Sequence, residues 1–320
     1  MIRAALICLI MIGIAASLLV GPAPIDLSDA AAGLLGQSSE ATNAIMREVR
    51  LPRSLGALIV GAGLGASGAA LQGFTRNDLA APGLLGFSAC AALGAVAALY
   101  FGLGQWLMPA AIGGALIGAS VIAVMARRQV GAGGLILAGI GIGALATAIT
   151  GLLMNLAPNP WALSELTYWL MGSLENVDAG GLFIAVPLTA VGLLALWRSG
   201  PALRALALGE DTATSLGVSL PRVQALIVIG TALCIGAGVA LAGAIGFVGL
   251  FIPHIMRRIV GPDPAALISH SALAGGVFLL ATDTLARLTA GPGTPLYLGI
   301  VTSLIGVPFF LYLALRRTPS

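Results

Sequence analysis

The chain has 320 residues, of which 58% are hydrophobic and 8% are charged, and its formal net charge at pH 7 is +3. Soluble domains average about 25% charged residues, so no soluble core could hide this much apolar surface and lipid must be the solvent. The composition excludes a soluble enzyme and predicts an all-α, polytopic membrane protein in a single transmembrane domain. Lipid is an expected partner, and nucleic acid is not.

Apolar segments recur at about the ~20 residues that a helix needs to cross a bilayer. We expect ten spans, so both termini lie on the same side of the membrane. The predicted spans are 3–21, 54–73, 83–102, 106–126, 134–156, 180–198, 223–243, 245–260, 267–290 and 296–315.

Two of these segments need comment. The first could instead be a cleaved signal peptide, but it is long and Pro24 follows its only Ala-x-Ala-like site, which favours a retained span. The eighth is short and contains Pro253, which predicts a bent or partial span. Glycines four residues apart, as at Gly61 and Gly65, predict helices that pack closely in lipid; Gly114/Gly118 and Gly139/Gly143 repeat the pattern.

The arginines are distributed unevenly, and lysine is absent. If the amino terminus lies inside, eleven arginines fall in inner loops and ends and four fall outside, namely Arg47, Arg50, Arg53 and Arg287. The excess of positive charge on the cytoplasmic side is a general property of membrane proteins. We therefore expect a multi-pass protein of the cytoplasmic (inner) membrane with both termini in the cytoplasm.

The longest polar stretch after the sixth span is too broken to cross a bilayer. Ser199 followed by Pro201 indicates a helix start, and Gly209 would end that helix in a left-handed residue. Glu210 favours the positive end of a second short helix, which Gly217 would stop. The sequence predicts two short cytoplasmic helices; the alternative is a solvated connector.

A weak internal repeat is visible. The tripeptide LPR at 51–53 begins an apolar run, and LPR at 220–222 begins another. Each run reaches a similar tetrapeptide, ALQG at 70–73 and ALAG at 240–243, followed by a proline. Five spans separate the copies, so they would cross in opposite senses, as in many transporters with inverted repeats. Chance similarity in an Ala/Gly/Leu-rich chain is the alternative.

Three outward arginines oppose the usual charge bias. Arg50 and Arg53 precede the second span, and Arg287 lies near the outer end of the ninth. They could extend to lipid headgroups, or they could form a docking surface for an acidic partner, because the planar guanidinium suits carboxylates. Asp283 lies four residues before Arg287, so the two could pair within one helix. Otherwise Asp283 would be a candidate pathway residue.

The chain carries no recognisable catalytic or metal site. A P-loop requires a lysine, so ATP hydrolysis would need a separate polypeptide that uses the ATP and Mg²⁺. Cys8, Cys90 and Cys234 are far apart in apolar runs, and neither His254 nor His270 has a partner at ligand spacing. We expect no metal and no cofactor bound by this chain.

Several motifs together resemble the FecCD-type permeases of ATP-binding-cassette importers for iron-siderophores, haem and cobalamin. The motifs are RLPR (50–53), SGAALQGFTRNDLAAPGLLGFS (67–88), LGEDTATSLGV (208–218), GAIGFVGLFIPHIMRRIVG (243–261), TDTLAR (282–287) and LGIVTSLIGVPFF (298–310). The resemblance implies a homodimer, a translocation path along the dimer axis, a cytosolic ATPase pair and an extracytoplasmic solute-binding protein.

The resemblance also implies roles for residues. It places Gly209, Glu210, Ala213, Leu216 and Gly217 in coupling helices at the ATPase. It makes Arg50, Arg53 and Arg287 docking residues for the binding protein. Pro253, His254 and Asp283 are candidates for the pathway or its gates, and the pathway itself should be lined by small and apolar residues.

The chain departs from the family pattern at two places. It has Asn77-Asp78 where family members often have Asn-Pro, and Thr294 where an acidic residue is usual. Two other function classes remain open at this point. One is a secondary transporter driven by an ion gradient at Asp283, and the other is a scaffolding membrane subunit.

Overall fold

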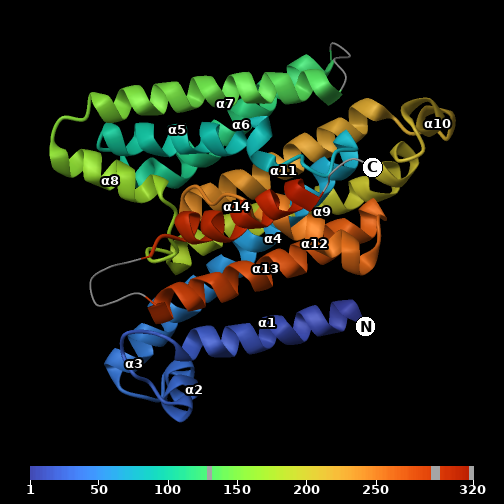
Figure 1. Ribbon diagram of the computed structural model, residues 1–320. Coiled ribbons are helices and arrows are strands. Elements are labelled where there is room, and N and C mark those ends of the chain that lie inside the picture. The colour runs from blue at the N-terminus through green and yellow to red at the C-terminus, as the bar shows by residue number, and fades with distance from the viewer. Residues whose placement is uncertain (128–131, 290–295, 317–320) are drawn as a thin grey trace.

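The computed structural model describes residues 1–127, 132–289 and 296–316, and this part of the chain is helical, with no strand. Thr294 lies outside it. Figure 1 shows the helices. They are α1 (Ile2–Leu19), α2 (Leu27–Leu35), α3 (Glu40–Ala44), the π-helix η1 (Ile45–Arg50), α4 (Leu51–Thr75), the 3₁₀ turn η2 (Pro82–Leu85), α5 (Phe87–Tyr100), the 3₁₀ turn η3 (Gly104–Trp106), α6 (Leu107–Arg127), α7 (Ala132–Asn155), α8 (Pro160–Leu170), α9 (Ala179–Leu206), α10 (Glu210–Ser215), α11 (Leu220–Ala242), α12 (Val248–Val260), α13 (Pro264–Thr289) and α14 (Leu298–Arg316).

Each of the ten predicted spans coincides with a helix, which confirms the all-α membrane fold. Within the described residues, seven helical segments are long and apolar enough to cross a membrane by length and composition. α5 and α14 are shorter apolar helices. α12 has 13 residues and contains Pro253, in agreement with the predicted partial span.

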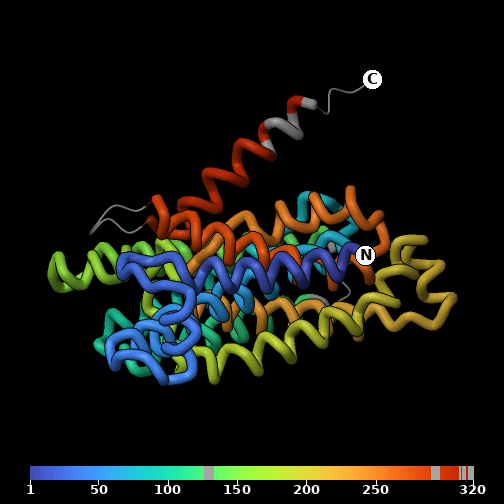
Figure 2. Tube along the Cα trace, turned by 90° about the horizontal axis from the view of Figure 1, so that it is seen from below, coloured from blue at the N-terminus to red at the C-terminus, as the bar shows by residue number. Residues whose placement is uncertain are grey.

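The helices run between two ends of the molecule. One end contains the start of α1, the end of α14 and the short helix α10 (Figure 1). The other end contains α2, α3 and α8. We call these the α10 end and the α8 end. Figure 2 shows α14 projecting from the bundle towards its carboxyl end.

α4 lies at the centre, in contact with α9, α11, α12 and α13. Its glycines bring the backbones together: a Cβ at Gly61 would overlap the Gly275 carbonyl, and one at Gly65 would overlap the Ser271 carbonyl of α13. The other predicted pairs behave alike. Gly114 lies against the Cys90 carbonyl, and Gly139 lies against Leu84. Small residues allow this close approach where lipid supplies no hydrophobic driving force between helices.

The helix start predicted at Ser199 is wrong. α9 continues through Pro201 to Leu206; Ser199 lies buried inside it, and its Oγ donates to the Leu196 carbonyl at 2.7 Å instead of capping a helix start. The chain also folds α2, α3 and α8 in polar intervals where no helix was predicted.

Both LPR motifs lie where an α-helix begins, although α4 continues directly from the π-helix η1. Leu51 is the first residue of α4 and Leu220 the first of α11, with proline in the first turn of each. α4 starts near the α8 end and α11 near the α10 end, so the two run in opposite senses (Figure 1). This arrangement is what an inverted repeat requires.

Candidate functional site

A buried ion cluster joins α4 to α13 at the α8 end. The Arg53 Nε lies 3.0 and 3.1 Å from the two Asp283 carboxylate oxygens, and its Nη2 lies 2.9 Å from Oδ1. Arg287 Nε lies 3.0 Å from Asp283 Oδ2. The Asp283 side chain is 0% exposed. The pairing of Asp283 with Arg287 predicted from their spacing is therefore present, and Arg53 adds a second guanidinium to the same carboxylate.

The same cluster holds the carboxyl end of α1. Arg50, only 4% exposed, donates to the Leu18 carbonyl at 2.7 Å and the Ala23 carbonyl at 2.5 Å. Arg287 donates to the carbonyls of Ser17 at 2.9 Å and Val20 at 2.7 Å. The last carbonyls of a helix have no partner within it, and cations there also complement its dipole. These two arginines anchor the carboxyl end of α1, where Ser17 Oγ also lies 2.7 Å from Ser54 Oγ of α4.

The structure thus brings the three outward arginines and Asp283 together. Arg50 is buried, and the exposed fractions of the Arg53 and Arg287 side chains are 17% and 9%. Their guanidinium groups bind partners inside the chain, which the sequence alone did not reveal for Arg50 and Arg53. We refer to Arg50, Arg53, Asp283 and Arg287 as the arginine cluster.

The predicted coupling residues lie at the α10 end. Gly209 precedes α10 with φ +112°, and Gly217 follows it with φ +82°, conformations that favour glycine. Glu210 lies in the first turn. Ala213 is fully buried and packs α10 onto the chain, whereas Leu216 is 65% exposed. Leu216 and Glu210 are therefore accessible to a partner protein, whereas Ala213 is not.

Two ion pairs at this end connect the loops to the spans. Arg204 Nε lies 2.6 Å from Asp263 Oδ1, and this hydrogen bond holds the pKa of Asp263 below its ordinary value. Arg76, the left-handed residue that ends α4, lies 3.7 Å from Glu210. α10 is thus linked to the end of α4.

The Asn77-Asp78 departure has a structural consequence. Asp78 pairs with Arg257 of α12, and Arg257 Nη2 also donates to Gln72 Oε1 at 3.0 Å. Gln72 Nε2 in turn donates to the Leu250 carbonyl at 3.3 Å. A proline at position 78 could not supply this carboxylate, so this chain gains a contact between α12 and the segment after α4.

α12 is irregular at its start and at Pro253. Phe247, the residue just before α12, has a left-handed conformation with φ +65°. Pro253 has no N–H, so the Gly249 carbonyl lacks its helical partner, and Gly68 of α4 lies against that carbonyl. His254 is 8% exposed, and its ring contacts Phe309 of α14 edge-on at 5.9 Å between centroids.

An apolar cavity of about 580 Å³ lies beside α14. It is lined by the end of α8, by the extended segment between α11 and α12, and by one face of α14. The lining residues are Leu170, Met171, Ala244, Gly246, Gly299, Ile300, Ser303, Leu304, Val307 and Pro308. Small and apolar residues were expected along a pathway, but neither Pro253 nor His254 is among them. The lining residues from Gly299 to Pro308 belong to the motif LGIVTSLIGVPFF (298–310), so this motif is the sequence feature that could have identified them.

Known proteins resemble this chain over most of its length. The model of the FecCD transport family matches residues 9–316. The cobalamin import system permease protein BtuC of Halobacterium salinarum is 40% identical over 282 residues, which cover 87% of this chain and 75% of that protein. The vitamin B12 import system permease protein BtuC of Citrobacter koseri is 40% identical over 273 residues, which cover 84% and 82%.

A solved structure has the same fold. It is described as an inward-facing conformation of a metal-chelate type ABC transporter, and it superposes with a TM-score of 0.88 at 29% identity, covering 98% of both chains. The residues that the family model matches include the arginine cluster and α10. The chain belongs to the FecCD transport family.

Proposed function

We propose that this chain is the membrane-spanning permease subunit of an ABC importer that moves a cobalamin, haem or iron-siderophore type chelate into the cytoplasm. The family match across residues 9–316 carries this proposal. The relatives named as cobalamin and vitamin B12 import permeases, and the metal-chelate transporter structure, support the substrate class.

The energy would come from a separate cytosolic ATPase. The chain has no lysine and so no P-loop. In this proposal the α10 end faces the cytoplasm and the ATPase binds α10 through Glu210 and the exposed Leu216. Arg76 and Arg204 lie at that end, and an excess of arginine is typical of the cytoplasmic side, which supports this orientation.

Two copies of the chain would form the translocation path. α14 exposes an apolar face that includes Leu304 at 69% and Leu311 at 61%, and it projects from the bundle (Figure 2). A second copy would cover this face and enclose the apolar cavity beside it. Because no charged residue lines this cavity, a bulky chelate could pass through it without being bound strongly. Selectivity would then rest with the solute-binding protein.

The α8 end would then receive the solute-binding protein, with the arginine cluster as one docking point. A binding-protein carboxylate would reach Arg53 first, because its side chain is more exposed than that of Arg287. The ion-gradient alternative gains no support, because two arginines already engage the Asp283 carboxylate.

ATPase stimulation tests this function. The chain is assembled with its ATPase in nanodiscs, and hydrolysis is measured with and without the liganded solute-binding protein. We expect stimulation that requires all three proteins. Hydrolysis that is indifferent to the permease would contradict the proposal.

A further inference from the structure

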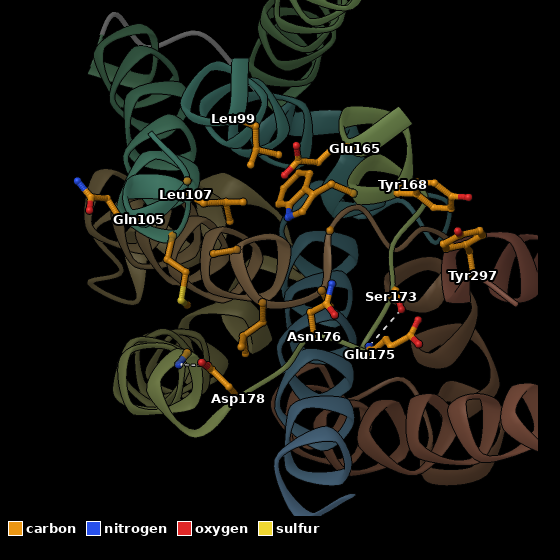
Figure 3. Close-up of a pocket in the computed structure, with 18 of the residues that line it drawn as sticks. Leu99, Gln105, Leu107, Glu165, Tyr168, Ser173, Glu175, Asn176, Asp178 and Tyr297 are labelled. Carbon is orange, nitrogen blue, oxygen red and sulfur yellow. Dashed lines mark hydrogen bonds between the residues drawn. The ribbon is translucent and has the colours of Figure 1, made fainter. Parts of the chain in front are cut away.

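A second cavity, which we call the α8 cavity, opens at the α8 end and measures about 890 Å³. It lies where the outer ends of α5, α6, α8 and α11 meet the connection from α8 to α9. Figure 3 shows Glu165 of α8 on one side of it, and Glu175 and Asn176 of the connection on the other. None of its lining residues belongs to the arginine cluster, to α10 or to the apolar cavity beside α14.

The lining of the α8 cavity is acidic and aromatic. Its three carboxylates are Glu165, Glu175 and Asp178, and no arginine lines it. Asp178 is already used, because its Oδ1 accepts from the Gly181 N–H at 2.7 Å and caps α9. Glu165 and Glu175 make no ion pair among the described residues. Two carboxylates therefore remain for an external cation.

Four aromatic side chains line the same cavity. The rings belong to Trp161, Tyr168, Trp169 and Tyr297. Tyr168 and Tyr297 lie 5.6 Å apart between ring centroids, tilted by 49°, and form one side of the cavity in Figure 3. Rings beside carboxylates attract ammonium and guanidinium groups through charge and cation–π interaction. No group of three or more acidic, His or Cys side chains that could hold a metal ion occurs in the described ranges, so the chemistry favours an organic cation.

The exposed charge of the whole α8 end points the same way. Apart from the buried Asp283, its carboxylates are exposed, and they are Asp26, Asp29, Glu40, Glu48, Glu165, Glu175 and Asp178. Its arginines, apart from the exposed Arg47, are those of the arginine cluster and are turned inward. A protein that approaches this end therefore meets negative charge first, and the complementary partner surface is basic.

We propose that Glu165 and Glu175 in the α8 cavity bind basic side chains, lysine or arginine, of the extracytoplasmic solute-binding protein. The inference rests on the proposed function, which supplies that partner. The arginine cluster would take a carboxylate and the α8 cavity a cation, so two docking points of opposite sign would fix the orientation of the partner.

The test is the association rate of the cognate solute-binding protein with the permease–ATPase complex in nanodiscs, at low and high ionic strength. The variant is Glu165→Lys with Glu175→Lys. We expect its association rate to fall on the order of tenfold at low ionic strength, and less at high ionic strength, because salt screens the repulsion. Basal ATPase activity, measured in the same samples, should match the wild type.

Glu40→Lys with Glu48→Lys is the matched control, since it changes the net charge of the same end equally but lies outside the cavity. A fall as large in this control would overturn the assignment to the α8 cavity, as would unchanged association in the cavity variant. Saturable binding of agmatine to the wild-type complex, lost in the cavity variant while protein association is unchanged, would assign the cavity to a free cation instead. A wild-type complex that binds no solute-binding protein would overturn the proposed function itself.

Discussion

Arg53 and Asp283 form a two-point ion pair, with Nε and Nη2 of the arginine 3.0 and 2.9 Å from the same carboxylate oxygen. The pair joins the central helix α4 to α13 across 230 residues of sequence. Arg287 contacts the other oxygen and holds the end of α1 as well. One fully buried carboxylate therefore fixes three helices at the end of the molecule that we assign to the binding protein.

The first prediction concerns this carboxylate. Asp283→Asn leaves two buried guanidiniums without their counter-charge, and removing one member of a buried ion pair costs about 3–5 kcal/mol. We expect a loss of this order in the free energy of unfolding in detergent micelles. Asp211→Asn, an exposed position in α10, is the control and should change stability by less than about 0.5 kcal/mol. Equal stability of the two variants would show that the cluster does not hold the helices.

Two members of the arginine cluster should have different roles: Arg53 binds the solute-binding protein, and Arg50 anchors α1. Arg53→Glu should slow association of the solute-binding protein most at low ionic strength, because like charges would then face each other. Arg222→Glu, at the α10 end, should leave association unchanged. Arg50→Gln should instead loosen α1, seen as faster hydrogen exchange near its carboxyl end. If Arg53→Glu and wild type associate equally fast at every salt concentration, the arginine serves only the fold.

A close glycine contact makes a prediction about packing. A Cβ at Gly68 would overlap the Gly249 carbonyl, which Pro253 leaves without its helical donor. Gly68→Ala should therefore force α4 and α12 apart, at a cost of about 1–3 kcal/mol or more. Gly113→Ala in α6, where a Cβ would meet nothing within 4 Å, is the matched control. Thermal unfolding of both variants in the same detergent measures the difference, and a Gly68→Ala protein as stable as the control would refute the contact.

The glycines that flank α10 lead to a prediction about coupling. Gly209 has φ +112° and ψ 154°, a region reserved for glycine, where other residues cost on the order of 1–3 kcal/mol. Gly209→Val should displace α10 and lower stimulation of the ATPase while membrane insertion survives. Gly151→Val, in α7 where a Cβ would meet nothing within 4 Å, should stimulate normally. Full stimulation by the Gly209→Val complex would remove α10 from the coupling role.

The spans could be predicted because each is a long apolar run, and lipid leaves a helix as the only way to satisfy its backbone. The same reasoning failed at Pro201, because α9 continues through this proline and Ser199 lies buried inside the helix. It also missed α8, whose sequence PWALSELTYWL is neither long nor apolar enough to be recognised as a span. Asp283 and Arg287 could be paired from their spacing, but Arg53 is 230 residues away and Arg50 binds main-chain carbonyls. No pattern in one sequence reports such contacts.

We propose that ATP hydrolysed by a partner, and not an ion gradient, drives transport through this chain. The most direct measurement is uptake of the bound chelate into proteoliposomes that contain the permease and its ATPase, with ATP enclosed and the solute-binding protein outside. We expect uptake to persist when an ionophore collapses the proton gradient and to stop when the ATPase is catalytically inactive. Uptake that follows the proton gradient, survives the inactive ATPase and disappears in Asp283→Asn would contradict the account.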